Sequence, residues 1–288
     1  MSNLTQRILT AIVGVPLLLL VFYFGSYYFL SFILLIVGLG SYEFFNLVDK
    51  KDLDNKKILG IIFCIILPLG AYYGYIYFIF LFTLVSILTL FIHLQKQDLS
   101  NTLTGAGTKF LGIVYIGWFL SHAVLIRNID SSSFPYLYDP SIKAGDIGYF
   151  WIVFVVACTF LNDTGAYFFG MFKGKTKLAP RLSPGKTVEG TVAGIIMAAI
   201  CGVFINLIFN SPIEYGWVLL MGFVVGVVAV IGDLIESMFK RSVSIKDSGG
   251  LLPGHGGVLD RFDSLILVFP MMYYLILLYY LRDSYLVF

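Results

Sequence analysis

Long apolar runs separated by short polar or glycine-containing breaks extend along almost all of this chain of 288 residues. A helix of roughly 20 apolar residues crosses the hydrocarbon core of a bilayer. On that measure the sequence predicts nine spans, at residues 8–25, 27–48, 58–74, 75–94, 110–126, 148–170, 188–209, 216–238 and 264–281. We therefore expect an all-α polytopic integral membrane protein with about nine transmembrane helices and no separate soluble domain.

The break between the third and fourth spans is the weakest of these boundaries. Only the sequence GAYYGY interrupts the apolar run over residues 58–94, and it is compatible with a kink as well as with a turn. The first apolar run is short enough to resemble a signal peptide. It lacks an A-x-A-like cleavage site and leads directly into a second run, so we expect it to be a retained span.

Composition supports a membrane protein and excludes several other classes. Hydrophobic residues make up 59% of the chain and charged residues only 12%, which lies outside the range of ordinary soluble domains. The formal net charge of +2 is too small to indicate nucleic-acid binding. Cys64, Cys158 and Cys201 lie in apolar segments without a C-x-x-C pair, and we expect them to be small core residues.

The basic residues predict the orientation of the spans. Lys and Arg near span ends remain mostly in the cytoplasm. With nine spans, 16 of the 19 Lys and Arg residues fall on the side of the N-terminus and 3 on the other. We expect a cytoplasmic N-terminus and an extracytoplasmic C-terminus. The chain then divides into an N-terminal region over 1–147 and a C-terminal region over 148–288 that carries the charged cytoplasmic loops.

Acidic residues gather at the loop between the last two spans. Asp233 and Glu236 precede it and lie on one helical face with Lys240, while Asp247, Asp260 and Asp263 lie within or just after it. Acids in a first helical turn can simply favour the helix dipole, by about 0.3–1 kcal/mol. The four aspartates among them would repel one another on one rim unless a cation binds them. Carboxylates with a single nearby His favour a hard ion such as Mg²⁺.

The same loop also carries features that suit an anion. Glycines let backbone N–H groups approach a phosphate closely, and the loop contains Gly249, Gly250, Gly254, Gly256 and Gly257 together with the cations Lys240, Arg241, Lys246 and Arg261. A solvated loop whose cations bind anionic lipid would explain the basic residues but neither the acids nor the glycines. The lone His255 is either a phosphate contact or a hydrogen-bonding loop residue.

A second basic loop, KGKTKLAPRLSPGKT, falls on the same predicted side of the membrane. GMFKGKT and SPGKT each fall short of a P-loop, and neither is predicted to follow a strand as that motif requires. Ser183, Lys186 and Thr187 lie at the start of the seventh span, where helix N–H groups favour phosphate, although Ser183 or Thr187 could equally be the helix cap. Asn162 and Asp163 end the sixth span and are candidates for selecting the base.

One stretch has a more specific pattern. Ser237-Met-Phe-Lys240-Arg241, four residues, Lys246-Asp247, Gly249, then Leu252-Pro253-Gly254-His255-Gly256-Gly257-Val258, one residue, and Asp260-Arg261-Phe262-Asp263 follow one another in order. This resembles the signature of the CTP:phosphatidate cytidylyltransferases, also called CDP-diacylglycerol synthases. NDTGAY and KLAPRLSPGKTVEG are also similar to that family, so the resemblance covers about residues 162–263.

The resemblance implies a Mg²⁺-dependent reaction in which CTP and phosphatidate give CDP-diacylglycerol and pyrophosphate. It also implies a polytopic helical fold in the inner membrane of a bacterial cell, often dimeric, with a monovalent cation as an optional second ion. Three matching acids would hold the metal: Asp233, Asp260 and Asp263. The wider catalytic set would add Lys240, Arg241, Lys246, Asp247 and Arg261. The substrate-binding set would be Asn162, Asp163, Ser183, Lys186, Thr187, Ser237, Gly254, His255, Gly256 and Gly257.

Three other classes were weighed against this one. A CTP-dependent lipid kinase of the dolichol-kinase kind shares the nucleotide but transfers the γ-phosphoryl group. An ion-coupled transporter would place its acids near the midplane of the membrane rather than beside a loop. A CDP-alcohol phosphatidyltransferase would need a D-G…A-R pattern before its D-x-x-D, and that pattern is absent here. The length of the signature favours the cytidylyltransferase.

Overall fold

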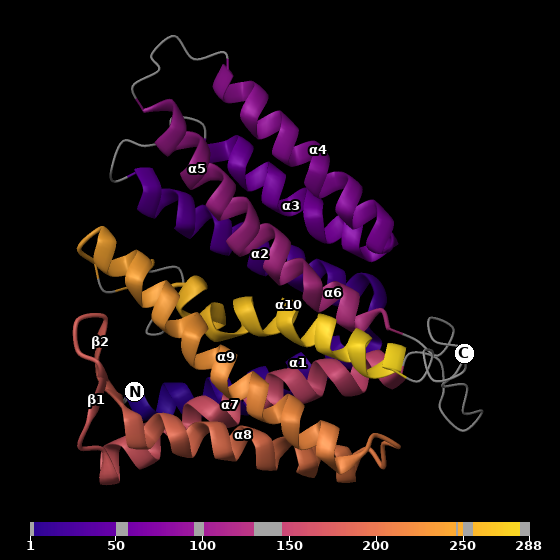
Figure 1. Ribbon diagram of the computed structural model, residues 1–288, viewed down its shortest axis with the longest axis vertical. Coiled ribbons are helices and arrows are strands. Elements are labelled where there is room, and N and C mark those ends of the chain that lie inside the picture. The colour runs from indigo at the N-terminus through magenta and orange to yellow at the C-terminus, as the bar shows by residue number, and fades with distance from the viewer. Residues whose placement is uncertain are drawn as a thin grey trace.

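Helices make up nearly all of the described chain (Figure 1). The computed structural model describes residues 3–49, 57–94, 101–129, 146–245, 247–249 and 256–282, and only the backbone over 3–13 and at 146. The helices are α1 (Asn3–Phe24), α2 (Ser26–Asp49), α3 (Lys57–Tyr73), α4 (Tyr75–Leu94), α5 (Thr102–Gly112), the π-helix η1 (Ile113–Trp118), α6 (Phe119–Arg127), α7 (Asp146–Lys173), α8 (Val188–Ile208), α9 (Tyr215–Ser242) and α10 (Leu259–Arg282). The described residues therefore follow the all-α architecture that the apolar runs predict.

Each predicted span corresponds to one continuous helical segment of the described chain, since α5, η1 and α6 run together from Thr102 to Arg127. Seven of these segments are long and apolar enough to cross a membrane by themselves. The apolar parts of α1 and α3, Gly14–Phe24 and Lys57–Tyr73, are shorter. The protein is thus a polytopic membrane protein, while the total of nine crossings stays a prediction.

The break in the apolar run over residues 58–94 is a turn. Gly74 has a φ of +128°, a left-handed value that favours glycine, and it joins α3 to α4. The two helices then pack side by side (Figure 1). A Cβ on Gly70 would lie 3.1 Å from the Cα of Phe78, so the chain reverses closely at this point. GAYYGY therefore separates two helices, as predicted.

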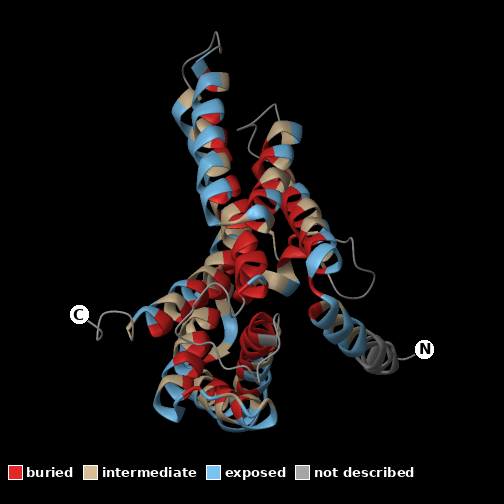
Figure 2. Cartoon of the chain, turned by 90° about the vertical axis from the view of Figure 1, so that its right-hand side faces the viewer, coloured by how far each residue is buried: buried red, intermediate tan, exposed pale blue. Residues whose placement is uncertain are grey.

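Two groups of helices meet at α10. In the C-terminal half α7 packs on α8, α8 on α9 and α9 on α10, while α2, α3, α4, α5 and η1 pack together in the N-terminal half. Helix α10 lies between the two groups and also contacts α6 and α2 (Figure 1). Buried positions gather where the groups cross, and exposed positions follow the outer faces (Figure 2). The three cysteines are free and buried, as predicted.

Small residues allow the helices of the C-terminal half to approach closely. Gly190 and Gly194 of α8 face α7, and Gly222 and Gly226 of α9 face α8, each pair at the G-x-x-x-G spacing. A Cβ on Gly222 would lie 2.8 Å from both the carbonyl oxygen of Ala198 and the Cα of Ala199. Backbone atoms on the facing helix cannot yield as a flexible side chain would.

We expect the substitution Gly222→Ala to lower the thermal unfolding temperature of the detergent-solubilised protein. Overpacking of this kind costs about 1–3 kcal/mol, because α8 and α9 must separate. Gly216→Ala is the matched control on the same helix, since nothing lies within 4 Å of the Cβ it would add. Equal unfolding temperatures for the two variants would contradict this account of the packing.

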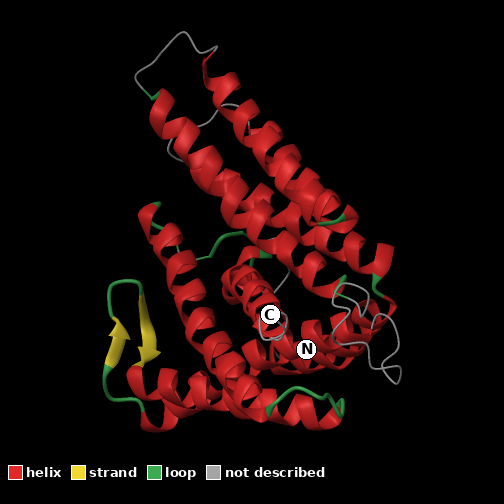
Figure 3. Ribbon diagram, turned by 45° about the vertical axis from the view of Figure 1, so that its right-hand side comes forward, coloured by secondary structure: helices red, strands yellow, loops and turns green. Residues whose placement is uncertain are grey.

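A small antiparallel hairpin between α7 and α8 was not predicted. Strand β1 (Lys177–Ala179) pairs with β2 (Ser183–Thr187), with Lys177 opposite Thr187 and Ala179 opposite Ser183 (Figure 3). Strands of three and five residues rich in Lys, Pro and Gly show no alternation that would reveal them. Thr187 then caps α8, because its Oγ1 accepts a hydrogen bond of 3.2 Å from the Gly190 amide. Of the two predicted caps, Thr187 is confirmed.

Candidate active site

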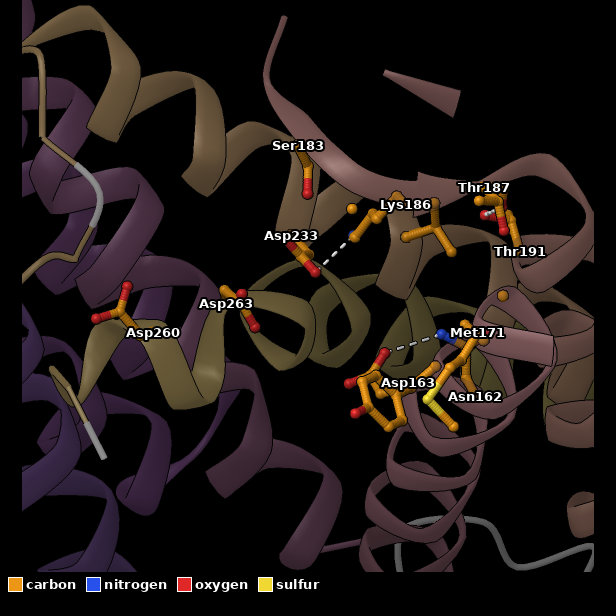
Figure 4. A pocket seen from close by; sticks show the side chains of 15 residues that line it. Asn162, Asp163, Met171, Ser183, Lys186, Thr187, Thr191, Asp233, Asp260 and Asp263 are labelled. Carbon is orange, nitrogen blue, oxygen red and sulfur yellow. Dashed lines mark hydrogen bonds and ion pairs between the residues drawn. The ribbon is translucent and has the colours of Figure 1, made fainter. Parts of the chain in front are cut away.

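A cavity of about 470 Å³ opens where the hairpin meets the ends of α7, α9 and α10 (Figure 4). Eight residues that the sequence indicated line it: Asn162, Asp163, Ser183, Lys186, Thr187, Asp233, Asp260 and Asp263. They come from four separate segments of the chain. The fold thus gathers both halves of the predicted site, the acids and the basic hairpin, around one hollow.

Lys186 on the hairpin reaches across the cavity to α9. Its Nζ lies 2.5 Å from Asp233 Oδ2, as the dashed line in Figure 4 shows. The other oxygen of Asp233 accepts a hydrogen bond of 3.3 Å from Ser237 Oγ, one turn further along the helix. Both side chains of the ion pair are about one-quarter exposed, so water and small ions can reach them.

Asp163 faces the cavity from α7. The Nδ2 of Asn162 donates to its Oδ1 at 3.0 Å. The Oδ1 of Asn162 points the other way, toward Gly226, where an added Cβ would lie 3.3 Å from it, and it has no hydrogen-bond partner among the described residues. Asn162 therefore supports Asp163 from behind, and Asp163 presents the carboxylate to the cavity.

Asp263 lies in the first turns of α10, and in the view of Figure 4 it falls between Asp233 and Asp260. One of its oxygens accepts a hydrogen bond of 2.6 Å from the amide of Ser264. The carboxylates of Asp163 and Asp233 are its electrostatic neighbours, along with the ammonium group of Lys240. Three acids thus approach one another around the cavity, together with the cations Lys186 and Lys240.

Asp260 has a different environment, because donors from its own chain occupy both oxygens. Oδ1 accepts from Lys240 Nζ at 2.6 Å. Oδ2 accepts from the amide and hydroxyl of Ser248, both at 3.0 Å, and from the amide of Gly257 at 2.9 Å. Gly256 adopts a φ of +80°, and a Cβ there would lie 3.1 Å from the same oxygen. We call the segment between α9 and α10 the glycine-rich loop. Asp260 therefore fixes both described ends of this loop, residues 247–249 and 256–258.

Lys240, which is predicted to share one helical face with Asp233 and Glu236, pairs with Glu236 on α9 and with Asp260 on α10. Its Nζ lies 2.5 Å from Glu236 Oε2 and 2.6 Å from Asp260 Oδ1. Glu236 is fully buried and Lys240 is 13% exposed. A cation held by two acids links α9 to α10, and in this geometry it reaches phosphate only by giving up one of those partners.

The remaining predicted residues that the structure describes are not part of the cavity lining. Arg241 donates to the carbonyl oxygens of Leu182 at 3.2 Å and of Ile245 at 3.1 Å, which ties the hairpin turn to the end of α9. Asp247 and Arg261 are exposed and do not line the cavity. Lys246, Gly254 and His255 lie outside the described residues.

Sequence reasoning missed Glu43. This acid lies in α2, is 2% exposed, and accepts three hydrogen bonds from the glycine-rich loop and the start of α10. An isolated carboxylate inside an apolar span is costly unless it is partnered or functional. Its position in the predicted span 27–48 was the signal that could have found it.

The arrangement suits the handling of a polyanion with a hard cation. Magnesium prefers oxygen ligands and commonly uses one or two carboxylates together with substrate phosphates. Within the described ranges, no three Asp, Glu, His or Cys side chains lie close enough to hold one ion by themselves. Two carboxylates facing a cavity beside a lysine fit that pattern, with room left for phosphate oxygens.

Comparisons with known proteins indicate the same family that the sequence signature resembles. Residues 5–279 match the model of the cytidylyltransferase family. The phosphatidate cytidylyltransferase of Bacillus subtilis strain 168 is 34% identical over 97% of this chain and 100% of its own length. The phosphatidate cytidylyltransferase of Synechocystis is 32% identical over 95% of this chain and 97% of its own. A match that extends over nearly the whole length of both chains shows that this protein belongs to the cytidylyltransferase family.

Proposed function

We propose that this protein is a phosphatidate cytidylyltransferase, which converts CTP and phosphatidate into CDP-diacylglycerol and pyrophosphate. The observation that carries the proposal is the cavity in which Lys186, Asp163, Asp233 and Asp263 converge. The family match and the named relatives support it. Phospholipid synthesis is the setting in which such an enzyme acts.

The reaction explains why this site needs no catalytic His or Cys. A phosphate oxygen of phosphatidate forms a bond to the α-phosphorus of CTP, and the bond from that phosphorus to the leaving pyrophosphate breaks. The attacking oxygen is already ionised near neutral pH, so a strong general base is unnecessary. The demand is to bring two polyanions together, align them and stabilise the leaving charge.

Residues of this chain meet that demand from two sides. Lys186 projects from the hairpin into the cavity, where it can pair with phosphate as it now pairs with Asp233. Thr187 and Thr191, at the start of α8, line the same wall. Asp163 offers an oxygen that can accept from the exocyclic amine of cytosine, with Asn162 holding it in place.

The proposal includes Mg²⁺, for which Asp233 and Asp263 provide oxygen ligands facing the cavity. When bound, such an ion neutralises phosphate charge and polarises the phosphoryl group. Asp260 stays a predicted third ligand, although its oxygens now accept hydrogen bonds from the loop. In this proposal the cavity-lining residues between Asn162 and Asp263 form one site, in which the acids bind the cation and Lys186 binds phosphate.

The orientation of the site and the oligomeric state are further parts of the proposal. The 16 to 3 division of Lys and Arg supports a site that faces the cytoplasm. There CTP arrives from water while the acyl chains of phosphatidate stay in lipid. A homodimer is proposed on the family resemblance alone.

One assay tests the proposed function against its nearest alternative. CTP labelled at the α-phosphate or at the γ-phosphate is supplied with phosphatidate and Mg²⁺ to the purified protein, and the organic phase is counted. We expect the α-label to enter lipid. Entry of the γ-label would indicate a lipid kinase, and label from neither position would refute the proposal.

A further inference from the structure

Glu43 connects the N-terminal half of the protein to the glycine-rich loop. Its Oε2 accepts hydrogen bonds from the Leu259 amide at 2.8 Å and from Ser248 Oγ at 3.2 Å. Its Oε1 accepts from the Val258 amide at 3.0 Å. These donors lie more than 200 positions away in the sequence, on a segment that ends at the site acids.

Two of the donors are the amides of Val258 and Leu259, at the start of α10. The first amides of a helix have no acceptor within the helix and need one from elsewhere. Glu43 supplies it from α2, and its negative charge also lies at the end of the helix dipole that favours anions. The start of α10, and with it Asp260 and Asp263, is therefore fixed against a helix of the other half.

The packing around the carboxylate leaves little freedom. A Cβ on Gly249 would lie 2.6 Å from Glu43 Oε1, and a Cβ on Gly257 would lie 2.6 Å from Oε2. The loop approaches Glu43 this closely only because both positions are glycine. Ser248 Oγ lies between Glu43 Oε2 and Asp260 Oδ2, at 3.2 and 3.0 Å. Because Ser248 has a single hydroxyl hydrogen, the two carboxylates from opposite halves share this one donor.

We propose that Glu43 is a positioning residue for cytidylyl transfer, which holds the glycine-rich loop and the first turn of α10 so that Asp260 and Asp263 face the substrates. It acts through Ser248, Val258 and Leu259 rather than by touching substrate. The inference rests on the proposed function for its catalytic part. The hydrogen bonds themselves are independent of which reaction the protein catalyses.

A charged acceptor is required at this position. The carboxylate accepts on both oxygens, whereas glutamine keeps one acceptor and turns an NH₂ group toward donors. Glu43→Gln therefore leaves one side of the contact without an acceptor while the side chain keeps its size. We expect this variant to lower kcat by about tenfold or more, with the KM for CTP changed by less than about threefold.

The experiment measures kinetics and amide hydrogen exchange on the full-length protein in detergent. Glu43→Gln is expected to accelerate exchange at one of the two amides, Val258 or Leu259, namely the one that then faces the NH₂ group in place of a carboxylate oxygen. Asp49→Asn is the matched control, because it neutralises an acid on the same helix that pairs with Lys57 at 3.1 Å. The control should leave both exchange and kcat near the wild-type values.

The outcomes separate this inference from the proposed function. Faster exchange together with a reduced kcat supports it, and an unchanged kcat in spite of faster exchange overturns the positioning role. Unchanged exchange overturns the contact itself. A wild-type protein without cytidylyl transfer would refute the proposed function and the catalytic part of this inference, while exchange would still test the contact. Should Glu43→Gln not fold, Ser248→Ala removes one shared donor, and a wild-type kcat in that variant overturns the proposal.

Discussion

We expect the variant Asp260→Asn to lose at least about 99% of cytidylyl transfer while the protein still inserts into the membrane and purifies as a folded species. The carboxylate accepts from Lys240, from Ser248 and from the Gly257 amide, and asparagine cannot satisfy these donors together. Lys240 keeps Glu236 as a partner, but each hydrogen bond lost to the charged group of Asp260 costs about 1.5–3 kcal/mol. Since about 1.4 kcal/mol corresponds to a factor of ten in rate, the loop and Lys240 need shift only in part to give this loss.

Label transfer from α-labelled CTP into lipid measures the activity, and size-exclusion chromatography in detergent checks the folding. Glu214→Gln serves as the control. Glu214 pairs with Arg282 where α9 begins and α10 ends, and the site residues lie toward the other end of each helix. That variant should keep wild-type activity. Activity near the wild-type level in Asp260→Asn would remove Asp260 from the site.

Asp263→Asn should raise the Mg²⁺ concentration needed for half-maximal activity by about tenfold or more. A neutral amide is a weaker ligand for a hard cation than a carboxylate, and Asp263 faces the cavity beside Asp233 and Asp163. Titration of activity with Mg²⁺ gives this value. Binding of Mn²⁺, followed by the electron paramagnetic resonance of the free ion, provides a measurement that does not depend on turnover.

Asp49→Asn is again the control, since that acid lies on α2 outside the cavity lining. Its Mg²⁺ requirement should equal that of the wild type. An unchanged requirement in Asp263→Asn, with weaker catalysis alone, would assign Asp263 a role other than holding the cation.

Much of the fold follows from the sequence because apolar length is a strong local signal. The predicted spans agree with the helices to within a few residues at most ends, and Gly74 marks the turn between α3 and α4. The hairpin before α8 gave no such signal. Its strands are too short to show a period, and Glu189 anchors it by accepting from the amides of Lys175 and Thr176 at 3.1 Å, a contact set by tertiary structure.

The candidate site was predictable where charge lies at a span end and less so where a role depends on a partner. Asp163, Asp233 and Asp263 do line one cavity with Lys186. Lys240 was expected to bind phosphate, and that role stays a prediction because the lysine pairs here with Glu236 and Asp260. Which of several cations faces an acid depends on packing between α9 and α10, and spacing along one helix does not reveal it.

The contact of Glu43 with the start of α10 also limits how such a chain can be rearranged. The signature residues lie in the C-terminal half, yet their loop is hydrogen-bonded to Glu43 of α2, which begins at Ser26. A segment transplanted without α2 would carry all of its acids and glycines and lose their anchor. A chimaera that joins halves of two relatives would therefore have to keep Glu43 matched with Gly249 and Gly257. A single methyl group added at either glycine would collide with the carboxylate of Glu43.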